Sequence, residues 1–166
     1  MKQYLLPFLF LCAVLLSCTS TRNTERKRNI VYDTTLKDSI EFYDQEIEIR
    51  QKDHLEKLMG GWNLVTMRRQ SQMQEEPLSN VYILFTSDTS FTGKAGCNNM
   101  SGRFGLKGTS IKFSDIIITK MACDKLEQET AFLQLLQNTV SAYTVNENQL
   151  LLRDGASNIV FIGNKR

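Results

Sequence analysis

Short runs in which apolar and polar residues alternate make up most of the chain after Gly61. The alternation of Leu150 with Leu152, and of Val160 with Ile162, is typical of strands that bury one face. Turn-forming residues separate these runs, and strands joined by such short turns must be antiparallel. The pattern predicts strands at 62–67, 81–86, 90–94, 102–106, 110–113, 142–145, 149–153 and 158–162.

Helical spacing interrupts the predicted strands at 128–136, where Phe132, Leu135 and Leu136 recur on one side. Glu127 and Glu129 lie near the start of this segment, where the helix dipole favours anions. The fold class that follows is α+β: a curved antiparallel β-sheet or partial barrel with one main helix. A domain of this size buries only a modest core, so an additional covalent restraint is expected.

The segment before the domain carries mixed signals. Residues 45–59 are rich in helix-forming residues and end at Gly60 and Gly61, which predicts a helix with a stop signal. Residues 30–44 show both helical and alternating spacings, so their structure stays undecided. His54 lies on the predicted helix, where a solvated or capping role is expected.

Residues 1–17 predict a signal peptide. Lys2 is followed by a short apolar run at 5–16, too short for a bilayer, which needs about 20 residues. Ser17 immediately before Cys18, with Leu15 further back, resembles the lipobox of bacterial lipoproteins. That resemblance implies cleavage before Cys18 and lipid on its thiol and its new amino group. The alternative is plain secretion with an incidental cysteine.

Residues 18–57 are expected to hold the lipidated cysteine, a polar tether and the partly helical segment, and 58–166 the folded domain. Four basic residues at 22–28 either rest on anionic headgroups or belong to a solvated linker. Thr19, rather than Asp, follows the lipidated position. By analogy with known sorting patterns this indicates the outer membrane of a Gram-negative bacterium, with the membrane as a partner through the lipid.

Cysteine arithmetic leaves one pair in the domain, since Cys12 leaves with the signal and Cys18 carries lipid. Cys97 and Cys123 remain, and in an oxidising compartment two such thiols usually join. A redox pair usually has Cys-x-x-Cys spacing, which is absent. Zinc needs further ligands, and the only histidine is His54, outside the domain. The expectation is a structural disulfide, with no metal and no cofactor.

Three segments resemble the motifs of META (HslJ-like) domains. They are Leu-Met-Gly-Gly-Trp-Asn-Leu at 58–64, Gly-Lys-Ala-Gly-Cys-Asn-Asn-Met-Ser-Gly-Arg-Phe at 93–104 and Thr-Lys-Met-Ala-Cys at 119–123. Lys120 stands where the family more often has Arg, and Glu129, Phe132 and Leu136 match its helix. The resemblance implies a small bacterial envelope protein, often a lipoprotein, linked to stress or antibiotic tolerance and without an established enzymatic activity.

The turn after Gly96 offers the candidate functional residues. Asn98, Asn99, Ser101 and Arg103 are interpreted mainly as parts of a tight turn, and alternatively as an exposed recognition edge beside the disulfide.

Enzymatic chemistry finds little support in the sequence. A nucleophile needs a neighbouring base, and the domain lacks histidine. The carboxylates at Asp115, Asp124, Glu127 and Glu129 have no spacing that singles out a pair. A formal net charge of +2 gives no drive toward nucleic acid. We expect a non-enzymatic envelope protein with an unknown envelope partner, or alternatively a binding lipoprotein that captures or inhibits an envelope or secreted enzyme.

Overall fold

The structure is a computed structural model and describes residues 34–69 and 74–166. The predicted signal peptide, the lipidation site Cys18 and the polar tether lie outside the described residues. The described elements are α1 (Thr34–Leu58), β1 (Gly60–Arg68), β2 (Glu75–Pro77), β3 (Val81–Phe85), β4 (Ser90–Ala95), β5 (Asn99–Lys107), β6 (Ser110–Ile118), α2 (Leu126–Asn138), β7 (Ala142–Asn146), β8 (Gln149–Arg153) and β9 (Ile159–Lys165).

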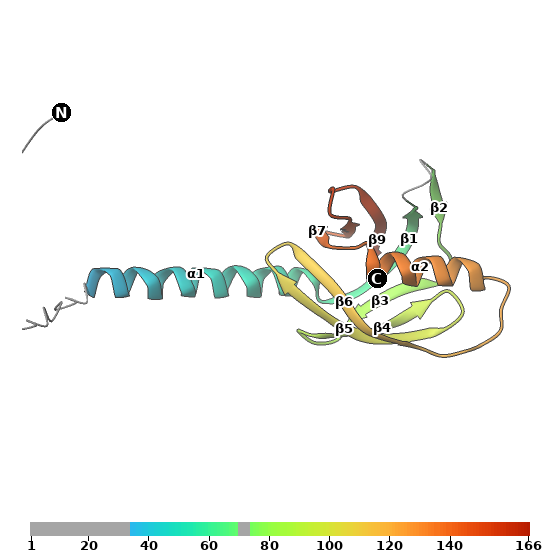
Figure 1. The fold of residues 1–166 in the computed structure, drawn as a ribbon, viewed down its shortest axis with the longest axis horizontal. Helices are drawn as coiled ribbons and strands as arrows, with labels where there is room; N and C mark the ends of the chain where they lie inside the picture. Colours follow the sequence, from blue (N-terminus) through green and yellow to red (C-terminus); the bar gives the residue numbers. More distant parts are fainter. Residues whose placement is uncertain (1–33, 70–73) are drawn as a thin grey trace, which may run out of the picture. The chain divides into compact units, whose positions relative to one another are not determined.

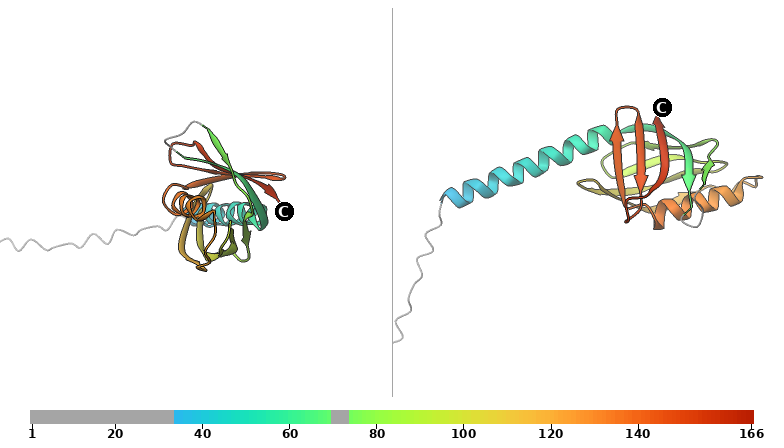
Figure 2. Two further views of the ribbon diagram at one scale, coloured as in Figure 1. Left: turned by 90° about the vertical axis from the view of Figure 1, so that its right-hand side faces the viewer. Right: turned by 90° about the horizontal axis from the view of Figure 1, so that it is seen from above.

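All strand pairings of the described residues are antiparallel, in the order β2-β1-β3-β4-β5-β6-β7-β8-β9 (Figure 1). β9 also pairs with β1, so the sheet curves round until β9, its last strand, lies beside β1 (Figure 2). β6 and β7 meet at the single pair Ser110↔Ala142. This confirms the predicted α+β class with a strongly curved antiparallel sheet, which remains incompletely closed between β6 and β7.

α2 connects β6 to β7 and packs its apolar side into the sheet. Phe132 and Leu136 are fully buried, and the Phe132 ring centroid lies 5.2 Å from that of Phe161 on β9. Leu126–Asn138 contains the predicted helix at 128–136 and extends it at both ends. Glu127 and Glu129 occupy the first turn, as the sequence predicts.

The core is formed by the inward-facing residues of the strands together with α2 and the end of α1. Trp62 on β1 is completely buried, and its indole N–H donates a 2.7 Å hydrogen bond to the carbonyl oxygen of Leu58. Because Leu58 is the last residue of α1 and is also fully buried, this bond fixes the junction between helix and domain. The Lys165 ammonium lies 4.3 Å from the Trp62 ring centroid.

α1 is longer than the sequence predicts, because the helix runs back through the undecided segment to Thr34. Most of its described side chains are exposed, and only its last turns join the core, through Leu55 and Leu58. Its first half gave a mixed signal because Ile40, Tyr43 and Ile47 recur at helical spacing while the exposed Phe42 and Ile49 add an alternating pattern. Neither described helix is sufficiently long and apolar to cross a membrane.

Two further differences concern the strands. The stretch at 68–80, where the sequence pattern predicts no strand, contains β2, an edge strand of three residues that pairs with β1 through Thr66↔Pro77, Met67↔Glu76 and Arg68↔Glu75. β6 runs on to Ile118 past a register shift, where Asp115 has a positive φ of 52°. Such a bulge adds a residue on one strand and bends it locally.

Candidate functional site

A disulfide joins Cys97, in the turn between β4 and β5, to Cys123, in the connection from β6 to α2. Their Cα atoms lie 6.4 Å apart, and both cysteines are half-buried. This is the pairing that the sequence predicts. The bridge brings the start of α2 against the glycine-rich turn.

The turn itself depends on Gly96, whose φ is +101°, a conformation that side-chain-bearing residues rarely adopt. The Asn80 amide donates a 2.9 Å hydrogen bond to the Gly96 carbonyl, and the Gly96 N–H donates to the Asn80 carbonyl at 3.2 Å. Ala95 N–H donates to the Asn98 carbonyl at 2.9 Å and closes the turn. The motif glycine therefore has a conformational role.

Asn98 lies inside the protein, with 1% of its surface exposed. Its backbone N–H donates to Oε2 of Glu129 at 2.8 Å, and its side-chain Nδ2 donates to Oε1 of the same carboxyl at 2.7 Å. Its Oδ1 accepts from the Thr119 hydroxyl at 2.9 Å and from the Met121 N–H at 2.7 Å. One side chain thus ties the turn to α2 and to the segment after β6.

The burial of Asn98 corrects the alternative interpretation that placed it on an exposed recognition edge. The disulfide holds the turn against α2, so Asn98 faces Glu129 rather than solvent. Glu129 is itself only 2% exposed, and both of its carboxyl oxygens accept hydrogen bonds from Asn98. Buried polar groups of this kind stabilise a fold when every partner is present.

The other three residues of the predicted edge lie at the surface. Asn99, Ser101 and Arg103 are exposed on the outer face of β5, where they alternate with the inward-facing Met100 and Phe104. This arrangement follows from the period of two along a strand. The structure therefore separates Asn98 from the three residues that remain available to a partner.

A shallow trough of about 400 Å³ lies on the outer face of β3 to β6, next to these residues. Its lining includes Tyr82, Thr92, Asn99, Ser101, Ile117 and Thr119. Ile117 is 71% exposed and forms an apolar rim. The sequence alone does not reveal this trough, because its residues come from four strands that only the pairing register brings together.

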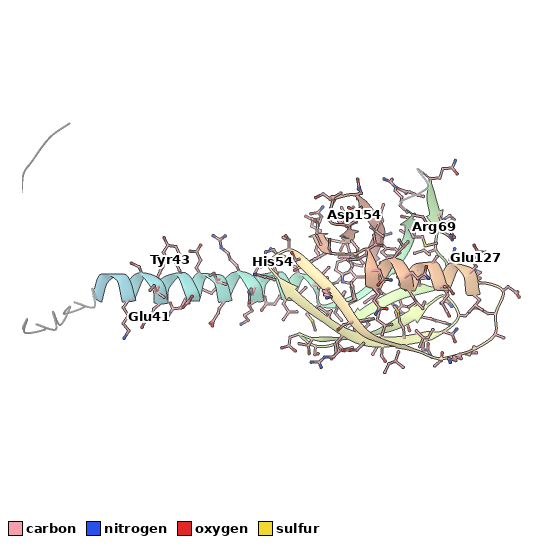
Figure 3. The ribbon with its side chains drawn as sticks, viewed as in Figure 1. Glu41, Tyr43, His54, Arg69, Glu127 and Asp154 are labelled. Atoms are coloured by element: carbon pink, nitrogen blue, oxygen red, sulfur yellow. A yellow bond between two sulfur atoms is a disulfide. The ribbon has the colours of Figure 1, made fainter. Side chains whose placement is uncertain are left out.

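The acidic residues of the domain are dispersed. Asp115, Asp124 and Glu127 are exposed, and the guanidinium of Arg69 lies 3.9 Å from the Glu127 carboxylate (Figure 3). Asp124 does not cap α2, because the N-cap residue is Lys125 and it forms no side-chain capping bond. In the described residues no group of three or more His, Cys, Asp and Glu side chains is placed to hold a metal ion.

Two further polar residues have structural roles that the sequence did not reveal. Asp154 is 5% exposed, and its Oδ1 accepts the N–H groups of Ala156 and Asn158 at 2.9 and 2.8 Å, which orders the β8–β9 turn (Figure 3). The Tyr143 hydroxyl donates to the His54 carbonyl at 3.4 Å. Burial raises the pKa of Tyr143, and the negative charge of Asp53 adds to this effect.

The geometry defines a class: a disulfide-bridged α+β domain with a curved antiparallel sheet, an internal Asn–Glu network and an open outer face. Residues 55–165 match the META domain, so the chain belongs to the META domain family. This confirms the resemblance carried by the sequence motifs.

Two solved structures are similar to this chain at low sequence identity. An NMR structure of a protein from Burkholderia xenovorans is 19% identical, with a TM-score of 0.53, covering 64% of this chain and 81% of that one. This similarity supports the fold alone. A crystal structure of a DUF4847 family protein from Bacteroides vulgatus is 17% identical, with a TM-score of 0.45, covering 64% of this chain and 92% of that one. No curated protein shows significant similarity to the chain.

Proposed function

We propose that the protein is a non-enzymatic, lipid-anchored envelope protein that presents its META domain on a helical spacer and contributes to envelope stress or antibiotic tolerance. In this proposal lipid on Cys18 holds the chain in the outer membrane of a Gram-negative bacterium. The proposal joins the lipobox-like residues and the family resemblance to one structural observation, the exposed helix α1.

α1 has the properties of a spacer. Its 25 residues span about 37 Å at 1.5 Å per residue. Three i,i+4 ion pairs support it along its exposed surface: Lys37–Glu41, Glu46–Arg50 and Asp53–Lys57. A helix with a largely polar surface and such pairs suits a segment that crosses solvent between two attached parts. Leu58 and its bond from Trp62 connect this spacer firmly to the domain.

The state of the buried carboxyl groups supports a non-enzymatic role. Glu129 is enclosed and uses both oxygens to accept hydrogen bonds from Asn98. Asp154 is likewise enclosed and accepts hydrogen bonds within its own turn. A general acid or base must reach a reacting group, and these two carboxyl groups already hold structural partners.

The anchor is tested by fractionating cells that express Cys18→Ser. We expect this variant to leave the membrane fraction, whereas Cys12→Ser, a matched change inside the predicted signal peptide, should stay membrane-bound. Persistent membrane association of Cys18→Ser would contradict lipidation.

The physiological part is tested by deleting the gene and measuring tolerance to heat, detergent and antibiotics. We expect reduced tolerance, restored by the wild-type gene and not by the Cys18→Ser gene. Unchanged tolerance after deletion would contradict the proposed contribution to stress resistance.

A second candidate function, a binding lipoprotein that captures or inhibits an envelope or secreted enzyme, is favoured by the apolar side chains of α1. Ile40, Tyr43 and Ile47 recur on one side of the helix and are 54%, 64% and 53% exposed (Figure 3 labels Tyr43). Contiguous exposed apolar residues often mark interaction sites. Crosslinking in envelope extract should give a saturable partner that Ile40→Ser/Ile47→Ser loses and that the control Gln45→Ser keeps.

A further inference from the structure

We propose that the trough on the outer face of β3 to β6 binds an anionic glycan, a sugar chain that carries carboxylate groups. The proposal goes beyond the anchored-envelope function, since the trough belongs to the folded domain and needs neither lipid nor α1. It rests on the register of four strands, on the free polar groups of the trough and on the charges around it.

The register explains why a trough forms. Leu84 pairs with Thr92, Thr92 with Ser101, and Ser101 with Ile117, so these four residues cross the outer face as one row. The two middle positions carry small side chains and the outer two carry large ones. Adjacent side chains in such a row lie about 5 Å apart, so the small pair leaves a depression between larger rims. Tyr82 adds to the rim on β3.

The polar groups of the trough are free to bind a ligand. Within residues 34–69 and 74–166 the side chains of Thr92, Asn99 and Ser101 make no hydrogen bond to the protein. The Thr119 hydroxyl differs, because it accepts from the Asn99 N–H at 3.1 Å and donates to Asn98. Two hydroxyls and one amide thus face the trough from neighbouring strands, and these groups match a ligand rich in hydroxyls.

Two cations stand at opposite ends of this face. Lys94 pairs with Asn99, and Arg103 pairs with Ser90, four residues earlier on β4 than Lys94. At 3.3 Å per residue these positions lie about 13 Å apart along the strands. None of the described carboxylates forms an ion pair with either cation. A ligand with repeated negative charges would supply the counter-charges that the protein lacks here.

A third cation lies at the Tyr82 rim. The Arg166 guanidinium carbon sits 4.1 Å from the Tyr82 ring centroid, and the Arg166 N–H donates to the Gly61 carbonyl at 2.9 Å. Stacking on the ring holds the guanidinium in place before a ligand arrives, which lowers the entropy cost of binding. None of the three cations lines the trough itself; they flank it, and the carboxylate of Asp115, exposed on β6, likewise lies outside the lining.

A glycan fits this face better than an acidic peptide. Extended peptides commonly bind by adding a strand to a free sheet edge. β3, β4 and β5 offer no such edge, since each is paired on both sides, and only β6, which meets β7 at the single pair Ser110↔Ala142, has an open edge. Over β3 to β5 recognition therefore proceeds through side chains, and hydroxyls, an amide, cations and an apolar rim suit a charged sugar chain.

The test measures binding of an oligogalacturonate to the full chain in neutral detergent by titration calorimetry. We expect saturable binding that weakens about tenfold or more in Lys94→Glu/Arg103→Glu, because both counter-charges are lost. Lys107→Glu, a matched charge reversal farther along β5, should bind like the wild type. Ser101→Trp, which fills the depression and keeps the charges, should also lose binding.

The contrary outcomes are equally definite. No saturable binding by the wild type, equal loss in Lys107→Glu, or equal binding of uncharged dextran would overturn the proposal. Tighter binding of poly-glutamate would overturn it in favour of an acidic peptide. Melting temperatures of all variants show whether each is folded. The Cys18→Ser variant should bind the oligogalacturonate like the wild type, so the test of the lipid anchor and the test of the trough give independent results.

Discussion

Glu129 on α2 and Asn98 beside the disulfide form a closed pair: one carboxyl oxygen accepts the backbone N–H of Asn98 at 2.8 Å and the other accepts its side-chain Nδ2 at 2.7 Å. The two residues lie 31 positions apart and are both buried. This polar contact of the motif region therefore faces inward and holds the turn to the helix.

Glu129→Ala should lower the free energy of unfolding by about 2–3 kcal/mol, because two buried donors of Asn98 lose their acceptor. Urea denaturation measures the change. Glu127→Ala is the control, since Glu127 is also in the first turn of α2 but its side chain is 92% exposed. A double-mutant cycle with Asn98→Ala should show coupling between the two sites. Equal effects of Glu129→Ala and Glu127→Ala would contradict the role of the pair.

Cys97→Ser and Cys123→Ser should each destabilise the oxidised protein by about 3 kcal/mol, the amount expected from closing a loop of this length in the unfolded chain. The double variant should be no less stable than either single variant, because one bond is lost in every case. Thermal melts with and without reductant measure this. Two free thiols per native wild-type domain would exclude the bridge.

Gly102→Ala should destabilise the protein by about 1–3 kcal/mol through overpacking. A Cβ at this position would lie 2.8 Å from the Phe91 ring and 3.0 Å from the Ser114 carbonyl oxygen. Gly105→Ala on the same strand is the matched control, because a Cβ there has no neighbour within 4 Å. Chemical denaturation should show a clearly lower free energy of unfolding for Gly102→Ala than for Gly105→Ala.

Tyr143 should make the protein sensitive to high pH. Burial raises its pKa, so the folded state favours the neutral phenol more than the unfolded state does. This contribution is fully present below the unfolded-state pKa of about 10 and is lost as the pH rises through the folded-state pKa. Urea midpoints between about pH 9 and 11 should fall less steeply for Tyr143→Phe than for the wild type. Tyr43→Phe, on the exposed part of α1, should follow the wild type.

The order of strands and helices was predictable because periods of 2 and 3.6 are local properties of the chain. β2 was not, since Glu75, Glu76 and Pro77 lack apolar alternation and pair along one side only. The first half of α1 was undecided because Phe42 follows Ile40 by two positions and adds an alternating pattern to the helical spacing of Ile40, Tyr43 and Ile47.

The candidate site was predictable in its covalent part and not in its polar part. The pairing of Cys97 with Cys123 follows from an oxidising compartment and from their being the two cysteines left in the domain. The burial of Asn98, by contrast, depends on a carboxyl group that only tertiary packing brings to it. One signal was available: Glu129 precedes Phe132 by three positions and Leu136 by seven, which places it on the buried side of α2.

The position of β1 has a mechanical consequence. β1 follows α1 directly and is paired with β3 and β2 along one edge and with β9 along the other. Tension that reaches the domain from its N-terminal side is therefore applied to a strand gripped along both edges. The load must shear two ladders of hydrogen bonds at once rather than peel one away, so a domain attached in this way resists pulling at the point where it is held.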